Sequence, residues 1–362
     1  MTSIEETAPI AAAAAAVEDG APPVEVDEAV AATTDSSNPA DDENAGDDNA
    51  NTNANKPKLN HKNYLNLLSY IANIVLVYGV GNARWLGTPT NGELSDKYQT
   101  LVTPNSAAFT IWAVIFVSQG VFALLQLLPR LRDHPMVQQG VSYWYMLVAA
   151  TQIGWTFTFA YEIIVASLVC MLLIWVSLIA ILYRQYYTES DGKLLEFWVL
   201  RFPFAIHAGW ITAASALNVN VQVVDMEVSA SMQLAVAIVS LAVLHAVSVW
   251  VLFNIPRPNW TMACVLSWAF GWIYVELDDP IEKITTTFDP DTIGGVKYAA
   301  ITVSFIIIAQ ILIRLVLLAI TSCNPYRARV NVVEDEEENG GVDEQAETKE
   351  VPSGLVIEEN KV

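Results

Sequence analysis

Charged side chains are scarce in this chain of 362 residues, and they are unevenly placed. They make up 16% of the sequence, against about 25% in soluble globular proteins. Residues 1–55 carry 13 acidic and no basic side chains, and residues 330–362 carry 11 acidic and two basic ones. Residues 56–329 carry 16 basic and 15 acidic side chains. The formal net charge of −21 therefore belongs to two acidic ends, and we expect no nucleic-acid partner.

Cysteine and histidine are scarce as well. The three cysteines, Cys170, Cys264 and Cys323, have neither the spacing of a metal site nor a disulfide framework. Cys170 and Cys264 lie in apolar stretches, where a thiol packs as a small hydrophobic group, and Cys323 is a candidate for acylation. The four histidines, which are His61, His134, His207 and His245, show no ligand spacing either. We therefore predict no metal site.

Both ends of the chain lack the means to form a core. Residues 1–55 contain no aromatic side chain, so they cannot bury enough apolar surface to offset the entropy lost on ordering. We expect disordered acidic tails over 1–60 and 326–362. The start MTSIEETAPI has acidic residues where a secretory signal has basic ones, which predicts insertion through the first internal apolar stretch.

Long apolar runs are abundant between the two tails. The mean hydropathy is +0.37, and 53% of residues are hydrophobic. Stretches long enough to cross a hydrocarbon core of about 30 Å as helices occur near 64–82, 107–128, 141–161, 163–183, 198–218, 230–253, 260–276 and 298–320. These runs predict an all-α, polytopic membrane bundle of about eight helices, with the lipid bilayer as its partner.

Basic residues predict the orientation of this bundle, because loops rich in Lys and Arg stay in the cytosol. One set of loops carries ten: Lys56, Lys58, Lys62, Arg130, Arg132, Arg184, Lys193, Arg257, Arg327 and Arg329. The alternate set carries four: Arg84, Lys97, Lys283 and Lys297. Both termini are therefore expected in the cytosol. The sequon at Asn259 falls on the same side, so we expect it to carry no glycan.

Polar and aromatic residues interrupt three of the apolar runs. Phe109 and Trp112 share one helical face in the second run, and Gln119 and Gln126 follow as hydrogen-bonding candidates. In the third run, Gln152, Trp155 and Phe159 share a face. A glutamine deep in a membrane span needs a partner, either a neighbouring helix or a ligand.

The fifth run, residues 198–218, is the most unusual. Arg201 at its edge is expected to extend to the lipid headgroups, and Pro203 suits the start of a helix. His207, Trp210 and Asn218 follow in its interior, and Trp210 and Asn218 face the same way two turns apart. The small residues at 213–216 predict close approach of another helix.

Together these motifs resemble the TspO/MBR family of tryptophan-rich sensory or translocator proteins. They read Asn91-Gly-Glu-Leu-Ser-Asp, Thr103-Pro104, Phe109-Thr-Ile-Trp112, Gln152-x-x-Trp155, and Pro203 followed by Trp210-x-x-Ala213 and Leu217-Asn218. The resemblance is nearest to the longer, divergent branch. It implies a five-helix membrane module over 61–220, and the three helices over 221–325 would be an extension.

The resemblance also implies a pocket among the five helices for porphyrin, haem or another flat hydrophobic molecule such as a sterol. Trp112, Trp155, Trp210 and Asn218 correspond to residues of the family motifs, and Gln152 stands where an Asn is usual. These five are our candidate ligand-binding residues. The loop after the first helix would cover the pocket, and a second copy of the chain is a candidate partner.

Other functions have weaker support in the sequence. A secondary transporter would show interrupted helices and an internal repeat, and we find no convincing repeat. A membrane enzyme would need a catalytic arrangement, and the spans contain no paired carboxylates and no Ser/His/Asp or Cys/His pattern. A retinal-type receptor needs a lysine inside a span, and the nearest, Lys297, lies at the edge of one. We therefore predict a non-enzymatic ligand-binding membrane protein.

Overall fold

A computed structural model describes residues 58–322 of the chain. These residues form helices and connecting loops, with no β-strand among them, which confirms the all-α prediction. The predicted disordered tails lie outside the described residues, apart from residues 58–60, as do Cys323, Arg327 and Arg329.

Eight long helices occur within residues 58–322, each at the position of one predicted span. They are α2 (His61–Gly81), α4 (Ile111–Leu125), α5 (Trp144–Ala160), α6 (Ile164–Tyr187), α7 (Phe202–Asp225), α8 (Ala230–Val249), α9 (Trp260–Glu276) and α11 (Pro290–Ser322). Two short helices, α3 (Asn91–Lys97) and α10 (Glu282–Thr287), lie in the connections.

Five of these helices are long and apolar enough to cross a membrane. Among the described residues they are α2, α4 together with the turn from Ser106, α6, α8 continued to Asn254, and α11. Helices α5 and α9 have 17 residues each, slightly fewer than the ~20 of a typical span. Helix α7 has 24 residues but carries several polar ones. That α5, α7 and α9 also cross the bilayer stays a prediction.

Local sequence features explain where the helices begin. Asn60 and Asn63 form a reciprocal capping box at the start of α2, which satisfies backbone N–H groups that have no partner within the helix. The Asn259 side chain accepts a hydrogen bond from the backbone N–H of Met262 at 3.1 Å and so caps α9. Pro203 lies in the first turn of α7, where its missing N–H costs no hydrogen bond.

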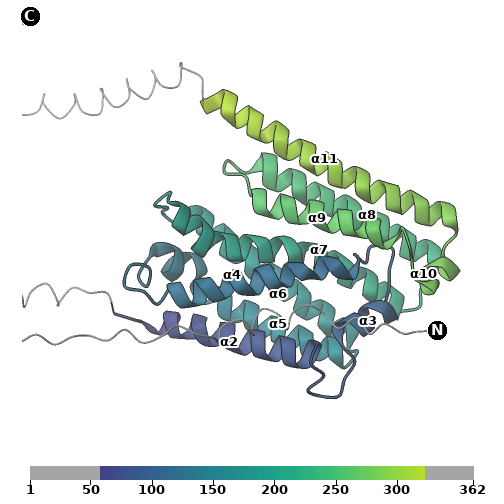
Figure 1. Ribbon diagram of the computed structural model, residues 1–362, viewed down its shortest axis with the longest axis horizontal. Coiled ribbons are helices and arrows are strands. Elements are labelled where there is room, and N and C mark those ends of the chain that lie inside the picture. Colours follow the sequence, from purple (N-terminus) through teal and green to yellow (C-terminus); the bar gives the residue numbers. More distant parts are fainter. Residues whose placement is uncertain (1–57, 323–362) are drawn as a thin grey trace, which may run out of the picture. The chain divides into compact units, whose positions relative to one another are not determined.

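Helix α7 is the central helix of the bundle (Figure 1). It contacts α4 and α6, and it also contacts α8 and α9. Helix α2 packs against α4 and α5, and α11 packs against α8 and α9. Fourteen of the 24 residues of α7 are buried. The central helix therefore joins the first five predicted spans to the last three.

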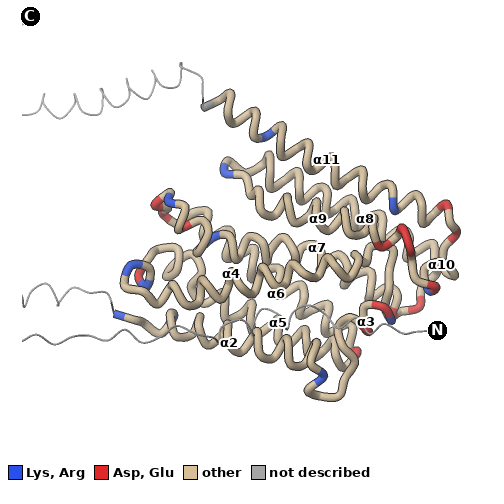
Figure 2. The backbone as a smooth tube through the Cα atoms, in the orientation of Figure 1, with Lys and Arg blue, Asp and Glu red and all other residues tan. Residues whose placement is uncertain are grey.

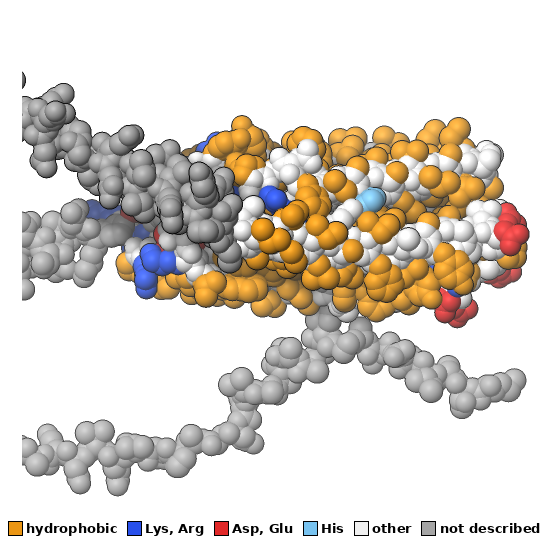
Figure 3. Space-filling model, turned by 90° about the horizontal axis from the view of Figure 1, so that it is seen from above, with side chains coloured by type: hydrophobic (Ala, Val, Ile, Leu, Met, Phe, Trp, Pro, Cys, Tyr) orange, Lys and Arg blue, Asp and Glu red, His pale blue; other side chains and the backbone are white. Residues whose placement is uncertain are grey.

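Charged residues gather at the two ends of the helices, and the length between them carries few (Figure 2). The face shown in Figure 3 is largely hydrophobic along this length. Large apolar side chains such as Leu68, Val117, Val165 and Phe305 are exposed on the helices, as expected of helices that face lipid. Below, the end with α3 and α10 is called the α3 end, and the other is called the opposite end.

Candidate functional site around Trp210

An aromatic cluster lies where α4 meets α7. Trp210 is buried at 2% exposure, and its ring makes edge-to-face contacts with Phe109 and Trp112 at centroid distances of 5.4 and 6.5 Å. Trp112 also contacts the His207 ring at 5.6 Å and stacks on Phe116 at 5.5 Å. The predicted shared face of Phe109 and Trp112 is confirmed, and both side chains pack against α7.

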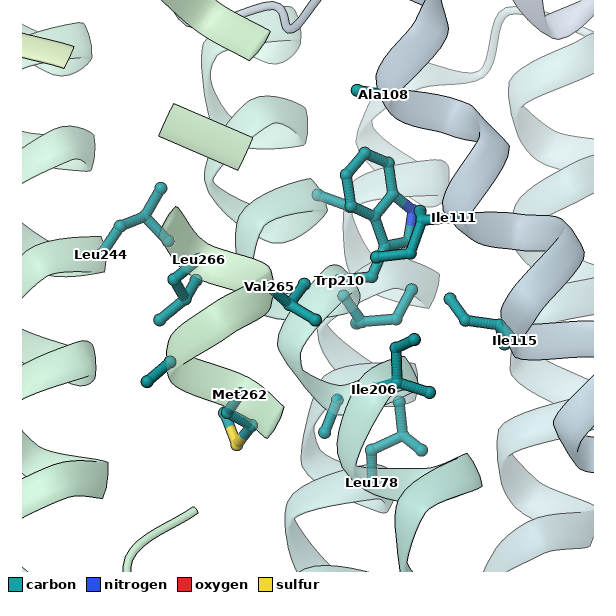
Figure 4. Close-up of a cluster of buried hydrophobic side chains, with 14 of the residues drawn as sticks. Ala108, Ile111, Ile115, Leu178, Ile206, Trp210, Leu244, Met262, Val265 and Leu266 are labelled. Carbon is teal, nitrogen blue, oxygen red and sulfur yellow. The ribbon is translucent and has the colours of Figure 1, made fainter. Parts of the chain in front are cut away.

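A small apolar cavity adjoins Trp210 on the side of α8 and α9. Its lining residues are Val102, Pro104, Phe109, Trp210, Ala213, Ala214, Ala216, Leu217, Leu244, Ala269 and Ile273. In Figure 4, Trp210 lies among side chains of α4 and α9, including Ile111 and Val265. The cavity volume of about 30 Å³ admits a group the size of a water molecule or a methyl group, whereas ligand pockets usually measure about 300–1,000 Å³. The site is therefore closed in this structure.

Trp155 and Asn218 form a second contact group, between α5 and α7. The Trp155 indole Nε1 donates to Asn218 Oδ1 at 3.1 Å, and Asn218 Nδ2 donates to the Ala214 carbonyl at 2.9 Å. Trp155 stacks on Phe159 with ring centroids 5.1 Å apart. Leu217 packs against this group and also lines the cavity. The pair thus lies directly behind one cavity wall.

Gln152 belongs to a third group, between α2 and α5. Its Oε1 accepts a hydrogen bond from Asn73 Nδ2 at 3.3 Å. Gln152 Nε2 and Asn73 Oδ1 are buried and have no hydrogen-bond partner among the described residues. Of the five candidate residues, only Trp210 lines the cavity. Trp112 touches Trp210, Trp155 and Asn218 lie behind Leu217, and Gln152 lies apart from them.

His207 is completely buried, and its ring is held by α4. Gln119 Nε2 donates to His207 Nδ1 at 2.9 Å, and Gln119 Oε1 accepts from the Tyr145 hydroxyl at 3.3 Å. This arrangement places the imidazole proton on Nε2, which has no partner among the described residues. His207 is therefore a hydrogen-bonded packing residue with one unused donor beside Trp112.

The sequence reasoning missed the polar residues of α2 that face this interior. Asn63 Nδ2 donates to Gln126 Oε1 at 2.9 Å, and Gln126 Nε2 donates to the Asn63 carbonyl at 2.8 Å. Asn63, Asn66 and Asn73 are all fully buried. Their spacing of three and seven residues along α2 was a readable signal, because residues so spaced share one helical face.

The sequence of this chain matches a known protein family over most of its length. The TSPO-like protein family matches residues 63–313, which is more than half of the chain. The chain belongs to the TSPO-like protein family. Searches of the curated proteins and of the solved structures found no match. The family match and the apolar helices together show an integral, multi-pass membrane protein of the TspO type.

The family match continues beyond residue 220 into α11. In this TSPO-like protein, α8 and α9 also contribute Leu244, Ala269 and Ile273 to the cavity wall. Helix α7 can lie close to α9 because Gly209 has no side chain. A Cβ atom at Gly209 would stand 2.9 Å from Val265 Cβ and 3.2 Å from Met262 Cα.

A network of polar contacts closes the α3 end of the TSPO-like fold. Glu162, in the turn between α5 and α6, is ion-paired with Lys97 and accepts a hydrogen bond from the Tyr98 hydroxyl at 2.7 Å. The bonds from Lys97 and Tyr98 hold the pKa of the Glu162 carboxyl below its ordinary value. Burial, together with the bond to Glu162, raises the pKa of Tyr98. The Tyr98 hydroxyl therefore keeps its proton and donates across the neutral range.

Glu276 at the end of α9 belongs to the same α3 end. Its Oε1 accepts from Gln99 Nε2 at 2.6 Å, and its Oε2 accepts from Asn105 Nδ2 at 3.0 Å. Asp278 instead pairs with Lys297 at 2.9 Å. Because these two carboxylates bind different protein groups, the acidic sequence 276–279 does not gather its oxygens around one cation.

At the opposite end, His134, Asp191 and Glu196 come together. His134 Nε2 lies 3.9 Å from an Asp191 oxygen and 4.0 Å from a Glu196 oxygen. His134 Nδ1 accepts the Met136 backbone N–H at 3.2 Å, so Nε2 of the neutral ring carries the proton and has no lone pair for a metal ion. The two carboxylates are instead paired with basic side chains, Asp191 with Lys193 at 3.0 Å and Glu196 with Arg201 at 2.6 Å, so the cluster is suited to ion pairs rather than to metal binding.

Arg201 takes part in this cluster, and the expected extension to the lipid headgroups is wrong. Arg201 Nε donates to Glu196 Oε1 at 2.6 Å, and the Glu196 side chain is only 2% exposed. Ser190 Oγ donates to the same carboxylate at 2.7 Å. A buried carboxylate requires a partner charge and hydrogen bonds, and that requirement draws Arg201 inward.

Proposed function

We propose that this TSPO-like protein binds a flat hydrophobic molecule of the tetrapyrrole or sterol class next to Trp210. One observation carries the proposal: Phe109 and Trp210 line a cavity whose lining side chains are all apolar apart from the indole N–H, and the Trp112 ring packs against Trp210. Aromatic faces stack on planar ligands. In the closed state Asn218 lies behind Leu217 and Gln152 lies apart from the cavity, so the proposal that their amides orient the ligand requires the opened site to extend past Leu217 toward α5.

Binding requires the closed site to open. A tetrapyrrole or a sterol is an order of magnitude larger than the present cavity of about 30 Å³. The movable parts are the Trp112 and Trp210 rings and the segment 99–105, which contributes Val102 and Pro104 to the lining. The occupied state is thus expected to differ from this one mainly at the α3 end and at α4.

Quenching of intrinsic tryptophan fluorescence by protoporphyrin tests the proposal. Wild-type protein in lipid nanodiscs is expected to show saturable quenching, with an affinity reduced about tenfold in Trp210→Phe, because a stacking surface is reduced. Trp250→Phe is the matched control, since Trp250 is 60% exposed and does not line the cavity. Non-saturable quenching that is equal in all three proteins would contradict the proposal for tetrapyrroles, and a sterol titration then tests the other ligand class.

We favour binding over catalysis for this protein, and a secondary transporter remains the main alternative. The proposed ligand site has no nucleophile or carboxylate in its lining. Uptake of the ligand into vesicles separates the two functions, because a binding protein retains ligand in proportion to protein, whereas a transporter accumulates it over time. We also propose that both termini are cytosolic, from the distribution of Lys and Arg.

A further inference from the structure

Residues 99–105, here called the plug, form a compact segment between α3 and α4. Thr100 and Thr103 hydrogen-bond to each other through their hydroxyls at 3.0 Å, and the Thr100 backbone N–H donates to Thr103 Oγ1 at 3.0 Å. Leu101, Val102 and Thr103 are no more than 3% exposed. The plug therefore has hydrogen bonds of its own and is packed into the protein interior.

Helix α9 fixes the plug by three hydrogen bonds. Two come from the side chains of Gln99 and Asn105 to the two oxygens of Glu276, at 2.6 and 3.0 Å. The third comes from the Asn105 backbone N–H to the Trp272 carbonyl, at 3.1 Å. The two side-chain bonds come from the first and last residues of the plug, so the Glu276 carboxylate binds both ends of the segment.

The plug covers the apolar cavity beside Trp210. Val102 and Pro104 line the cavity from the plug, and Ala269 and Ile273 line it from α9. Ile273 precedes Glu276 by three residues, so the cavity wall and the carboxylate that fixes its cover lie within one turn of the same helix. Opening of the cavity toward the α3 end requires the plug to separate from Glu276.

We propose that Glu276 is a positioning residue that holds the plug closed and thereby sets how fast an apolar ligand enters and leaves the cavity. This inference rests on the proposed function for its ligand, which is the flat hydrocarbon body of a tetrapyrrole or sterol. The plug is also held next to α3, where Lys97 and Tyr98 bind Glu162 and the Lys97 carbonyl accepts a hydrogen bond from Lys283. Loss of the bonds to Glu276 would therefore free the α9 side of the plug and leave the α3 side attached.

Thiol accessibility tests this role without any ligand. Ala214 lines the cavity, so Ala214→Cys, in a chain whose three native cysteines are replaced by alanine, reports opening through its rate of maleimide modification. Glu276→Ala removes both acceptors and is expected to raise the rate about tenfold. Glu276→Gln keeps one acceptor oxygen and should restore slow modification in part. Gln99→Ala should add little to Glu276→Ala, because the two residues act through one bond.

Asp278→Ala is the matched control, because Asp278 follows the same helix end but pairs with Lys297 rather than with the plug. Its modification rate should equal that of the parent. A rate unchanged in Glu276→Ala, or raised equally in Asp278→Ala, would overturn the inference. Protoporphyrin association and dissociation should both accelerate in Glu276→Ala at similar affinity. Faster modification with unchanged ligand kinetics would also overturn it, whereas absence of binding in the parent refutes the proposed function alone.

Discussion

At the scale of single residues, the interior of this protein is governed by the cost of polar atoms in an apolar environment. Each buried amide of α2 or α4 has at least one partner on another helix, as in the pairs Asn63–Gln126 and Asn73–Gln152. An unpartnered polar group in hydrocarbon is costly. These pairs therefore determine which helix faces meet, even though each hydrogen bond contributes only modestly to the free energy of unfolding.

The Asn63–Gln126 pair offers a test of this view. Gln126→Leu removes a donor and an acceptor and leaves Asn63 buried without them, which is expected to cost about 2 kcal/mol of unfolding free energy. Replacing both residues by leucine should recover part of the loss, because the Asn63 amide is then no longer buried without Gln126; recovery is only partial, since Asn66 Nδ2 also loses its contact with Gln126 Oε1. The measurement is unfolding in mixed micelles. A double variant less stable than the sum of the single variants would argue against the pairing.

The residue scale also shows the limits of sequence reasoning. The spacing of Phe109 and Trp112 correctly indicated a shared face, because helical periodicity fixes which residues lie on one side of a helix, and Gln119 and Gln126 do hydrogen-bond to neighbouring helices. It did not indicate that Gln119 would bind His207, or that Gln99 would bind Glu276 across 177 positions of sequence. Periodicity defines a face but not the helix that packs against it.

At the scale of secondary-structure elements, α7 owes its central place to a run of small residues. Gly209 allows contact with α9, and Ala213, Ala214 and Ala216 leave the space that forms the cavity. The sequence predicted close helix approach at 213–216. The structure shows a close approach to α9 one turn earlier, at Gly209, whereas Ala213, Ala214 and Ala216 line the cavity.

Gly209→Ala should therefore destabilise the protein. Its new Cβ would meet Val265 Cβ at 2.9 Å and the backbone of α9 at 3.2 Å, so the helices must separate, at a cost of roughly 1–3 kcal/mol. Gly271→Ala is the control within α9, since its nearest contact would be Ser304 Oγ at 3.9 Å. That variant is expected to be neutral or slightly stabilising. Thermal midpoints in detergent distinguish them, and equal midpoints would contradict the packing described for α7 and α9.

The α3 end should weaken in acid. The folded-state pKa of Glu162 lies below the ordinary value of 4.5 because Lys97 and Tyr98 bind the carboxylate. Its contribution to stability is therefore complete above pH 4.5 and is lost as the pH falls through the lowered folded value. Because the pair is partly exposed, we expect a loss below about 1 kcal/mol.

Glu162→Gln isolates this contribution. The variant should be less stable than wild type at neutral pH, and the difference between their thermal midpoints should shrink as the pH falls below 4.5. A difference that stays constant from neutral pH to pH 3 would show that the carboxylate is not ionised in its contacts with Lys97 and Tyr98.

At the scale of the whole molecule, we propose that all eight long helices of the described residues cross the bilayer, an even count that would put both ends of the chain on one side. Apolar length predicted where all eight helices lie, because hydropathy depends on local composition. It did not predict that α8 and α9 complete the cavity beside Trp210, which depends on how α7 packs. The third, fifth and seventh predicted spans, which are α5, α7 and α9, are the ones least explained by hydropathy alone.

Glycosylation mapping tests the orientation. An acceptor site engineered into the loop between α2 and α3 should be modified in microsomes, because this loop is predicted to be lumenal. The natural sequon at Asn259 should stay unmodified, and its side chain is in any case engaged in capping α9. Modification at Asn259, or none in the α2–α3 loop, would reverse or disprove the orientation.

The central claim is that a flat hydrophobic ligand occupies the cavity beside Trp210, and photo-crosslinking tests it most directly. A diazirine-bearing porphyrin would be bound to the wild-type protein in nanodiscs, irradiated, and its sites of attachment identified by peptide mass spectrometry. The account predicts attachment within the plug, around Ala213–Leu217 of α7 and near Ala269–Ile273 of α9, suppressed by excess unlabelled porphyrin. Attachment confined to lipid-facing residues such as Phe305 and Leu312, unaffected by competitor, would contradict the claim.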